Sequence, residues 1–296
     1  MRGRSFPRLS WEAVVGAVLL TATLAVVVVG PLVTPYSPTQ VAVAAPNLSP
    51  SADHWLGTDW LGRDVFSRFL AGGREVLLLP FIAVVFAYVV GGMIGIYATL
   101  RGGWVDAVIA RGFNLLLVLP PMLLGLVVLG AAGSSRLAMG GLLALVSLPR
   151  AGRVIRGAAQ TVAGSEYVMA AVGRGEHSLY IVRRELLPNI ALPVLADLGV
   201  NLTYQIIFAS SLSFLGFGAQ PPTADWGRMV ADSIPMLTTT PLAALVPAVG
   251  IALAAISVNL LAEALAQRLG GNRGTRLGRG RSRSVISART TNVKAV

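Results

Sequence analysis

The sequence predicts an all-α, polytopic membrane protein with six transmembrane helices and a short polar helix between the fourth and fifth. Three observations support this fold class. Of the 296 residues, 54% are hydrophobic and only 12% are charged, whereas soluble domains carry about 25% charged residues. The apolar residues form long runs separated by short polar segments, and the arginines concentrate in alternate segments. The chain contains no cysteine, which excludes disulfides, thiolate metal sites and cysteine nucleophiles.

The first two apolar runs, residues 13–33 and 76–100, are each long enough to cross a bilayer, which takes about 20 residues. Three arginines precede the first run, in residues 1–12. This order of basic and apolar residues is also typical of a secretory signal, but the run is too long for one, so we expect an uncleaved span. Gly91 and Gly95 in the second run form a small-xxx-small pair, which predicts close approach of a neighbouring helix.

A polar segment, residues 34–75, separates these two runs. Between residues 57 and 64, charged residues alternate with glycines, which predicts a tight, internally hydrogen-bonded loop leading into a helix. Asp53 and His54 could also be interpreted as a metal or catalytic pair. No third ligand lies at a useful spacing, so a structural loop is favoured.

The remaining spans are less regular. The third, residues 107–129, contains Pro120-Pro121 at its middle, and two prolines there kink or break a helix. The fourth, residues 131–149, is continuously apolar only over 137–148, but without this crossing the arginines that follow it would face outside. The fifth and sixth spans are predicted at residues 190–215 and 242–265.

The basic residues predict the orientation. Nineteen of the 24 fall in the segments that six spans place on the same side as the N-terminus, and five fall on the other side. The positive-inside rule then puts both termini and the short polar helix in the cytoplasm. Because the arginines lie in short loops, this rule explains the net charge of +11 better than nucleic-acid binding does. The tail, residues 267–296, is rich in Arg, Gly and Ser, which predicts disorder near anionic lipid headgroups.

The longest polar segment between the apolar runs, residues 162–189, has a helical pattern of its own. Tyr167, Ala170, Ala171 and Arg174 follow i, i+3, i+4, i+7 spacing and share a helix face. Glycines follow, and Pro188 is expected to prevent a helix from running through it unbroken. The pattern therefore predicts a helix over roughly residues 163–176, a glycine turn and re-entry into the next span. Such a helix could bind a soluble partner; an ordinary solvated loop is the alternative.

Three polar residues in the fifth span, Asp197, Asn201 and Gln205, are candidates for a transport pathway, because polar groups are costly in lipid and should face the interior. Asp197 and Glu263 could instead bind ions in a gradient-driven secondary transporter or channel, although no inverted repeat is evident. An enzyme is disfavoured, because no nucleophile and base pair or phosphate-binding loop is recognisable. We therefore expect no catalytic residue, metal or cofactor on this chain.

The polar segment resembles a cytoplasmic motif, E-A-A-x3-G-x9-I-x-L-P, of the permease subunits of binding-protein-dependent ABC importers. The two alanines of the motif fall on Ala170 and Ala171 and its glycine on Gly175. Met169 stands at the position of the glutamate and Glu185 at that of the isoleucine, so both depart from the pattern.

Three further stretches, residues 57–68, 212–229 and 247–265, are similar to the second permease of the dipeptide, oligopeptide and nickel group. Together with the cytoplasmic motif they run through most of the chain between residues 57 and 265. The subgroup often has a glutamate where this chain has Ala209, so a polar contact to cargo is either absent or supplied elsewhere.

The resemblance implies an importer for peptides or a related small solute in a bacterial plasma membrane. Its partners would be a second permease, two ATPase subunits that hold ATP and Mg, and an extracytoplasmic solute-binding protein. The short helix would then be a coupling helix that docks on an ATPase. The residues expected to form this contact are Glu166, Tyr167, Ala170, Ala171, Val172, Gly173, Arg174 and Gly175.

Overall fold

The computed structural model describes the backbone of residues 11–291 and the side chains of Trp11 and of residues 13–266. Every regular element in this part of the chain is helical. The α-helices are α1 Trp11–Val29, α2 Val65–Arg101, α3 Gly103–Val118, α4 Pro121–Ala132, α5 Arg136–Ala163, α6 Glu166–Gly173, α7 Ser178–Tyr180, α8 Leu187–Phe214, α9 Trp226–Ser233 and α10 Pro241–Thr291. Short η segments are Gly30–Leu32 (η1), Ile181–Leu186 (η2) and Ile234–Met236 (η3).

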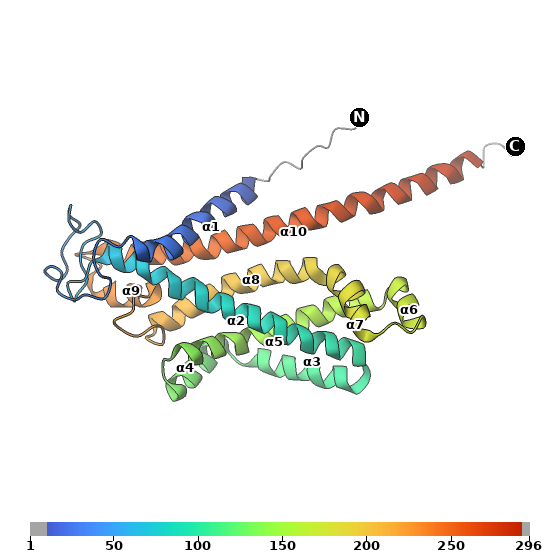
Figure 1. Cartoon of the computed structure of the whole chain (residues 1–296), viewed down its shortest axis with the longest axis horizontal. Coiled ribbons are helices and arrows are strands. Elements are labelled where there is room, and N and C mark those ends of the chain that lie inside the picture. The colour runs from blue at the N-terminus through green and yellow to red at the C-terminus, as the bar shows by residue number, and fades with distance from the viewer. Residues whose placement is uncertain (1–10, 292–296) are drawn as a thin grey trace.

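Long antiparallel helices form one elongated bundle (Figure 1). The α6–α7 hairpin lies at one end of the bundle, which we call the α6 end. The loop before α2 and the helix α9 lie at the opposite end, the α9 end. α1 runs toward the α9 end, and α10 runs from the α9 end toward the α6 end (Figure 1). Residues 1–10 and 292–296, parts of the predicted cytoplasmic N-terminus and tail, lie outside the described residues.

Five helical stretches are long and apolar enough to cross a membrane: Ala13–Leu32, Val65–Arg101, Arg136–Ala163, Ser178–Phe214 and Pro241–Ala266. The region of the predicted third span, residues 107–129, is divided between two helices, which form either a broken span or a re-entrant loop. α3 and α4 meet the same criterion only as a pair, and they are bent by 83° at the break. The break falls at Leu119 and Pro120, because Pro121 begins a new helix and the residue before a proline is held extended. The expected kink or break is thus found at Pro120-Pro121.

Several predicted boundaries are corrected. The second span was predicted at residues 76–100, but α2 begins at Val65 because Asp64 caps its N-terminus, with its carboxylate accepting a hydrogen bond from the Ser67 backbone N–H at 2.7 Å. The fourth span was predicted at 131–149, but α5 covers Arg136–Ala163. Half of its apolar window is buried inside the protein, the largest share among the five long stretches. A span so enclosed faces protein more than lipid, which explains why its mean hydropathy is lower than that of the other four stretches.

Two glycines of α2, Gly91 and Gly95, allow α5 to approach closely. A Cβ atom added at Gly91 would lie 2.6 Å from the carbonyl oxygen of Leu148, and one at Gly95 would lie 2.6 Å from that of Gly152. Gly152 in turn packs directly under the ring of Phe113 from α3. The small-xxx-small prediction is confirmed, and α5 is the neighbouring helix that it predicted.

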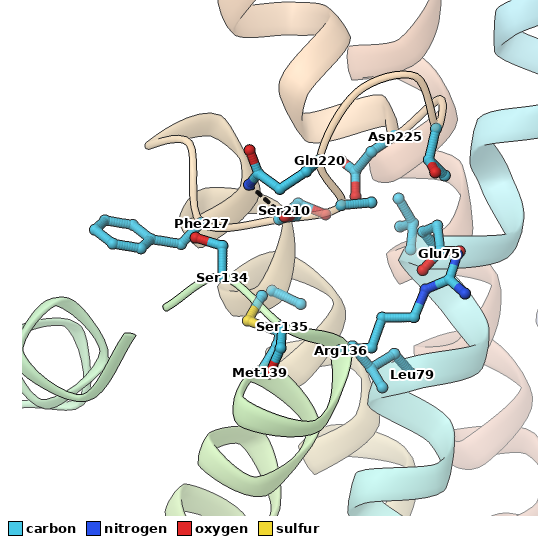
Figure 2. A pocket seen from close by; sticks show the side chains of 15 residues that line it. Glu75, Leu79, Ser134, Ser135, Arg136, Met139, Ser210, Phe217, Gln220 and Asp225 are labelled. Atoms are coloured by element: carbon cyan, nitrogen blue, oxygen red, sulfur yellow. Dashed lines mark hydrogen bonds and ion pairs between the residues drawn. The ribbon is translucent and has the colours of Figure 1, made fainter. Parts of the chain in front are cut away.

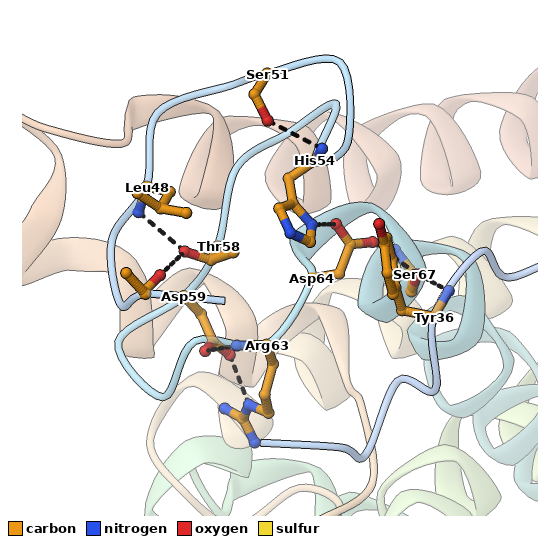
Figure 3. Close-up of polar contacts among 10 residues, drawn as sticks. Tyr36, Leu48, Ser51, His54, Thr58, Asp59, Arg63, Asp64 and Ser67 are labelled. Atoms are coloured by element: carbon orange, nitrogen blue, oxygen red, sulfur yellow. Dashed lines mark hydrogen bonds and ion pairs between the residues drawn. The ribbon is translucent and has the colours of Figure 1, made fainter. Parts of the chain in front are cut away.

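The polar loop before α2 is held by its own side chains, as predicted (Figure 3). The Thr58 hydroxyl accepts a hydrogen bond from the Leu48 N–H at 2.9 Å and donates one to the Ala45 carbonyl at 2.7 Å. The Asp59 carboxylate binds the buried guanidinium of Arg63, with the two side chains 2.6 Å apart. These contacts satisfy buried polar groups and fix the loop over the α9 end.

His54 is part of the same loop and pairs with a carboxylate other than the neighbouring Asp53. Its Nδ1 lies 3.0 Å from Oδ1 of Asp64, and both side chains are buried, while Asp53 is exposed. Among the described residues, no group of three His, Cys, Asp or Glu side chains could hold a metal ion. The structural interpretation of this loop is therefore supported over the metal pair.

We expect Asp64→Ala to loosen this loop, because the substitution removes the cap of α2 and leaves His54 and Ser67 without their carboxylate partner. A lost N-cap costs about 1 kcal/mol, and a buried unpaired group adds about 1–3 kcal/mol. Limited proteolysis of the purified protein should show faster cleavage within residues 33–64. Asp53→Ala is the matched control, and equal cleavage of the two variants would contradict this account of the loop.

α10 continues through residues 267–291, where composition predicts disorder. The segment contains no proline, so nothing in it strictly terminates a helix that starts in the sixth span. We expect a chain truncated after Leu269 to reach the membrane in normal amounts, since the tail lacks the apolar residues that form a core. Immunoblots of membrane fractions would measure this, and loss of the truncated chain would show that the tail supports the fold.

Candidate coupling and transport sites

α6 is a two-turn helix with defined ends. It begins after Ser165, whose backbone carbonyl accepts hydrogen bonds from Val168 and Met169 at 3.1 and 3.0 Å. At its other end, the Gly175 N–H bonds the Val172 carbonyl and the Glu176 N–H bonds the Ala171 carbonyl. This pair of bonds is the Schellman motif.

The Schellman motif requires a residue with positive φ after the helix, and Gly175 adopts φ +76°. A Cβ atom there would meet no atom within 4 Å. The reason for a glycine at this position is therefore the turn that ends α6, in addition to any contact with a partner. The predicted glycine turn is found at this residue.

The free face of α6 differs from the predicted face in one residue. Ala171 is fully buried and lies against the chain itself together with Val168, which belongs to the apolar cluster between α2, α5 and α8. The other predicted contact residues are exposed: Glu166, Tyr167, Ala170, Val172, Gly173, Arg174 and Gly175. The spacing placed Ala170 and Ala171 together because adjacent positions are only 100° apart on a helix, and the tertiary contact separates them.

Three exposed apolar residues at the α6 end were missed by the sequence reasoning. Met169, Leu179 and Tyr180 are 56%, 65% and 43% exposed and accompany the exposed Tyr167 and Val172. The apolar character of Leu179 and Tyr180 in a polar segment was the available signal. A group of exposed apolar side chains at the tip of a hairpin is typical of a protein contact surface.

The hairpin joins α8 through a π-helix, and this corrects the prediction that Pro188 would interrupt the helix. The stretch Ser178–Phe214 is continuous. Residues Ile181–Leu186 adopt the wider π turn, and Pro188 then occupies the first turn of α8, where a missing N–H is tolerated. The Asn189 side chain donates to the Glu185 carbonyl at 2.7 Å, which supplies a partner near the proline.

The predicted pathway residues lie on the inner face of α8, in contact with two other helices. Oδ2 of Asp197 accepts a hydrogen bond from the Tyr88 hydroxyl of α2 at 2.5 Å. Oδ1 of Asp197 lies 3.0 Å from Nη2 of Arg150 on α5. The expectation that Asp197 faces the bundle interior is confirmed, and its charge is paired there as a membrane span requires.

Asn201 and Gln205 lie one and two turns further along α8 and are almost completely buried. They line a cavity of about 170 Å³ at the break between α3 and α4, together with Arg150, Tyr204 and apolar residues of α3, α4 and α5. The cavity lies between the two ends of the bundle. Glu263, the other candidate ion-binding residue, is exposed on α10 and accepts a hydrogen bond from Asn259 at 2.9 Å.

A second cavity, of about 210 Å³, opens at the α9 end between α2, α5, α8 and the loop before α9 (Figure 2). Arg136 of α5 reaches across to Glu75 of α2, with Nη2 and Oε1 2.5 Å apart. Ala209, which stands where the subgroup often has a glutamate, lines this cavity, and Glu75 and Asp225 line it as well. Sequence reasoning missed Glu75 and Arg136, because 61 residues separate them.

Asp225 connects this cavity to α9. Burial raises the pKa of its carboxyl group, and the Ser213 hydroxyl of α8 donates a hydrogen bond to it, which opposes that shift. The next residue, Trp226, is buried, stacks on Phe69 with ring centroids 4.9 Å apart and donates to the Phe69 carbonyl at 2.7 Å. α9 is thereby fixed to α2 and α8 at this end.

Membrane spans that enclose polar side chains, with cavities along the bundle and a short helix presented at one end, define a membrane transport protein. Residues 87–271 match the family described as the binding-protein-dependent transport system inner membrane component. The chain belongs to this family. It is a multi-pass permease subunit of an ATP-driven importer that works with a solute-binding protein and ATPase partners, and the gradient-driven alternative is not favoured.

Curated relatives support the same assignment over most of the chain. The dipeptide transport system permease protein DppC of Alkalihalophilus pseudofirmus is 32% identical, covering 87% of this chain and 84% of the relative. A putative peptide permease of Brucella suis is 36% identical, covering 86% and 84%. The glutathione transport system permease protein GsiD of Pectobacterium atrosepticum is 34% identical, covering 75% and 74%.

Proposed function

We propose that this chain pairs with a second permease subunit to form the pathway of an importer for short peptides. Its α6 docks on one of two ATPase subunits, which bind ATP and Mg, while this chain carries no cofactor and performs no catalysis. The observation that carries the proposal is the exposed apolar tip of the α6–α7 hairpin, directly joined to the spans α5 and α8. The names of the relatives, which include dipeptide, peptide and glutathione permeases, favour peptides as cargo.

We place the α6 end in the cytoplasm of a bacterial cell, with both chain ends there, and the α9 end outside, where the solute-binding protein would dock. The distribution of arginines supports this orientation, because the α6 end carries exposed Arg174, Arg183 and Arg184 in the described part of the chain. The cavity beside the Glu75–Arg136 ion pair then faces the side from which cargo arrives.

Purification of the tagged chain in mild detergent tests the proposal. The ATPase subunits and a second permease should copurify, and proteoliposomes that contain the complex should take up a short peptide only when ATP and the solute-binding protein are present. Uptake that continues without nucleotide and stops when ion gradients are dissipated would contradict the proposal. A single-cysteine variant at Gly173, labelled only from the external face, would contradict the orientation.

A further inference from the structure

Gln205 is an unusual residue for the middle of a membrane protein. Its side chain is fully buried, and neither its Nε2 nor its Oε1 makes a hydrogen bond within the described residues. Most buried side-chain polar atoms have a partner, and the cost of lacking one is greatest where water is excluded. Neither the Nε2 nor the Oε1 of Gln205 has a hydrogen-bond partner in the described part of this chain. We therefore expect a molecule outside this chain to supply one.

Gln205 lines the cavity of about 170 Å³ at the break between α3 and α4. One water molecule takes up about 30 Å³ in the liquid, so the cavity has room for several waters or for part of a small solute. Asn201, one turn away, lines the same cavity. Its Nδ2 also makes no hydrogen bond within the described residues.

Arg150 provides a cation at the same cavity. Its Nε and Nη2 atoms both contact Oδ1 of Asp197, at 3.3 and 3.0 Å, and its Nη1 is not used in that pair. The Arg150 side chain is 36% exposed, compared with 16% for Asp197. The cation therefore remains accessible, while its position is fixed by the carboxylate and, through it, by Tyr88 of α2.

The Gln205 amide and the Arg150 guanidinium together indicate which chemical groups a ligand in this cavity would carry. A glutamine side chain donates one hydrogen bond and accepts another, which is the complement of a peptide group, and a guanidinium binds a carboxylate. We propose that this cavity binds the carboxyl-terminal end of a short peptide in transit, with Gln205 on the last peptide group and Arg150 on the terminal carboxylate. This inference rests on the proposed function, and it assigns cargo contacts to named residues of this subunit.

The test uses the complete complex in proteoliposomes, with the second permease, the ATPases and the solute-binding protein, and radiolabelled dialanine and trialanine as probes. Gln205→Leu keeps the volume of the side chain but removes its donor and acceptor. We expect peptide uptake to fall at least tenfold, while ATP hydrolysis stimulated by the loaded binding protein stays within twofold of wild type. The thermal stability of the variant should not fall, because an unpaired buried amide is removed.

Ser147→Ala is the matched control. Ser147 is also buried in a span with an unpaired hydroxyl, but it lies outside the lining of the cavity, so uptake should be unchanged. Normal peptide uptake by Gln205→Leu would overturn the inference. So would a parallel loss of stability and uptake in Gln205→Leu, since that result assigns Gln205 a structural role.

A second experiment separates cargo from water. The chain has no cysteine, so Gln205→Cys introduces its only thiol. A charged methanethiosulfonate should modify this thiol during turnover, and excess dialanine should slow the modification at least threefold. Modification that the peptides do not slow would mean that the cavity holds only water and would overturn the inference. If the wild-type complex imports no peptide with ATP, then the proposed function itself fails, and that result is visible before any variant is made.

Discussion

Replacing Gly173 with tryptophan should abolish ATPase association while the chain still folds and inserts. A Cβ atom at Gly173 would meet no atom of this chain within 4 Å, and the residue is exposed at the end of α6. The indole would therefore project from the free face and hold an ATPase groove away from Tyr167 and Val172. Loss of central contacts in an interface costs about 2–4 kcal/mol, so ATPase binding should weaken roughly 30- to 1000-fold.

Copurification of the ATPases with the tagged Gly173→Trp chain measures this effect, and membrane fractions report insertion. Gly173→Ala is the matched control, because a methyl group at the same position fills little space and should leave binding near wild type. Gly173→Trp separates docking from folding better than Ala171→Glu or Gly175→Arg would. Ala171 is buried and Gly175 has positive φ, so those two changes alter α6 itself. Wild-type binding by Gly173→Trp would show that the ATPase contact lies elsewhere.

Replacing Gly95 with leucine should prevent stable folding. The added Cβ atom would lie 2.6 Å from the Gly152 carbonyl oxygen and 3.2 Å from the Arg156 backbone nitrogen. Both are backbone atoms of a helix and cannot rotate away, so α2 and α5 must separate. Overpacking typically costs about 1–3 kcal/mol, and we expect the upper end of this range, about 3 kcal/mol, because the two nearest neighbours are backbone atoms.

The separation would also strain the neighbouring contact between α5 and α3, where the Arg156 guanidinium binds Asp106 with 2.5 Å between Nη2 and Oδ2. We expect less folded Gly95→Leu protein in membranes and a lower midpoint of thermal unfolding after purification. Gly130→Leu on α4 is the matched control, because no atom lies within 4 Å of a Cβ atom there. If both variants unfold at the wild-type temperature, the α2–α5 contact does not determine stability.

The transmembrane character of the chain was predictable because length and hydropathy alone decide whether a helix crosses a bilayer. The residues at which each helix begins and ends could not be predicted from length and hydropathy. The capping of α2 by Asp64 and the extension of α5 to Ala163 depend on local hydrogen bonds and on burial against other helices. The π turn before Pro188 was not predictable either. From the sequence, a proline at this position predicts the end of a helix, but the wider π turn of Ile181–Leu186 lets the helix continue past it.

The residues of the candidate sites also fall into those that the sequence identified and those that only the tertiary contacts reveal. Asp197, Asn201 and Gln205 were identified because polar residues stand out in an apolar run, and each turns inward. Arg150 was not identified, because an arginine at the edge of a predicted span has an ordinary explanation as a positive-inside charge. Its pairing with Asp197, 47 residues further along the chain, is visible only once α5 and α8 lie side by side.

The unbroken course of α5 has a mechanical consequence. Its 28 residues extend about 42 Å at 1.5 Å per residue, from Arg136 beside the Glu75 carboxylate to the turn that begins α6. If α5 tilts as one unit about its α6 end, which we propose contacts an ATPase, a tilt of about 10° displaces its Arg136 end by about 7 Å. That displacement exceeds the reach of the Arg136–Glu75 contact, so in the orientation proposed above a small rotation at the α6 end would separate this ion pair and widen the cavity at the α9 end.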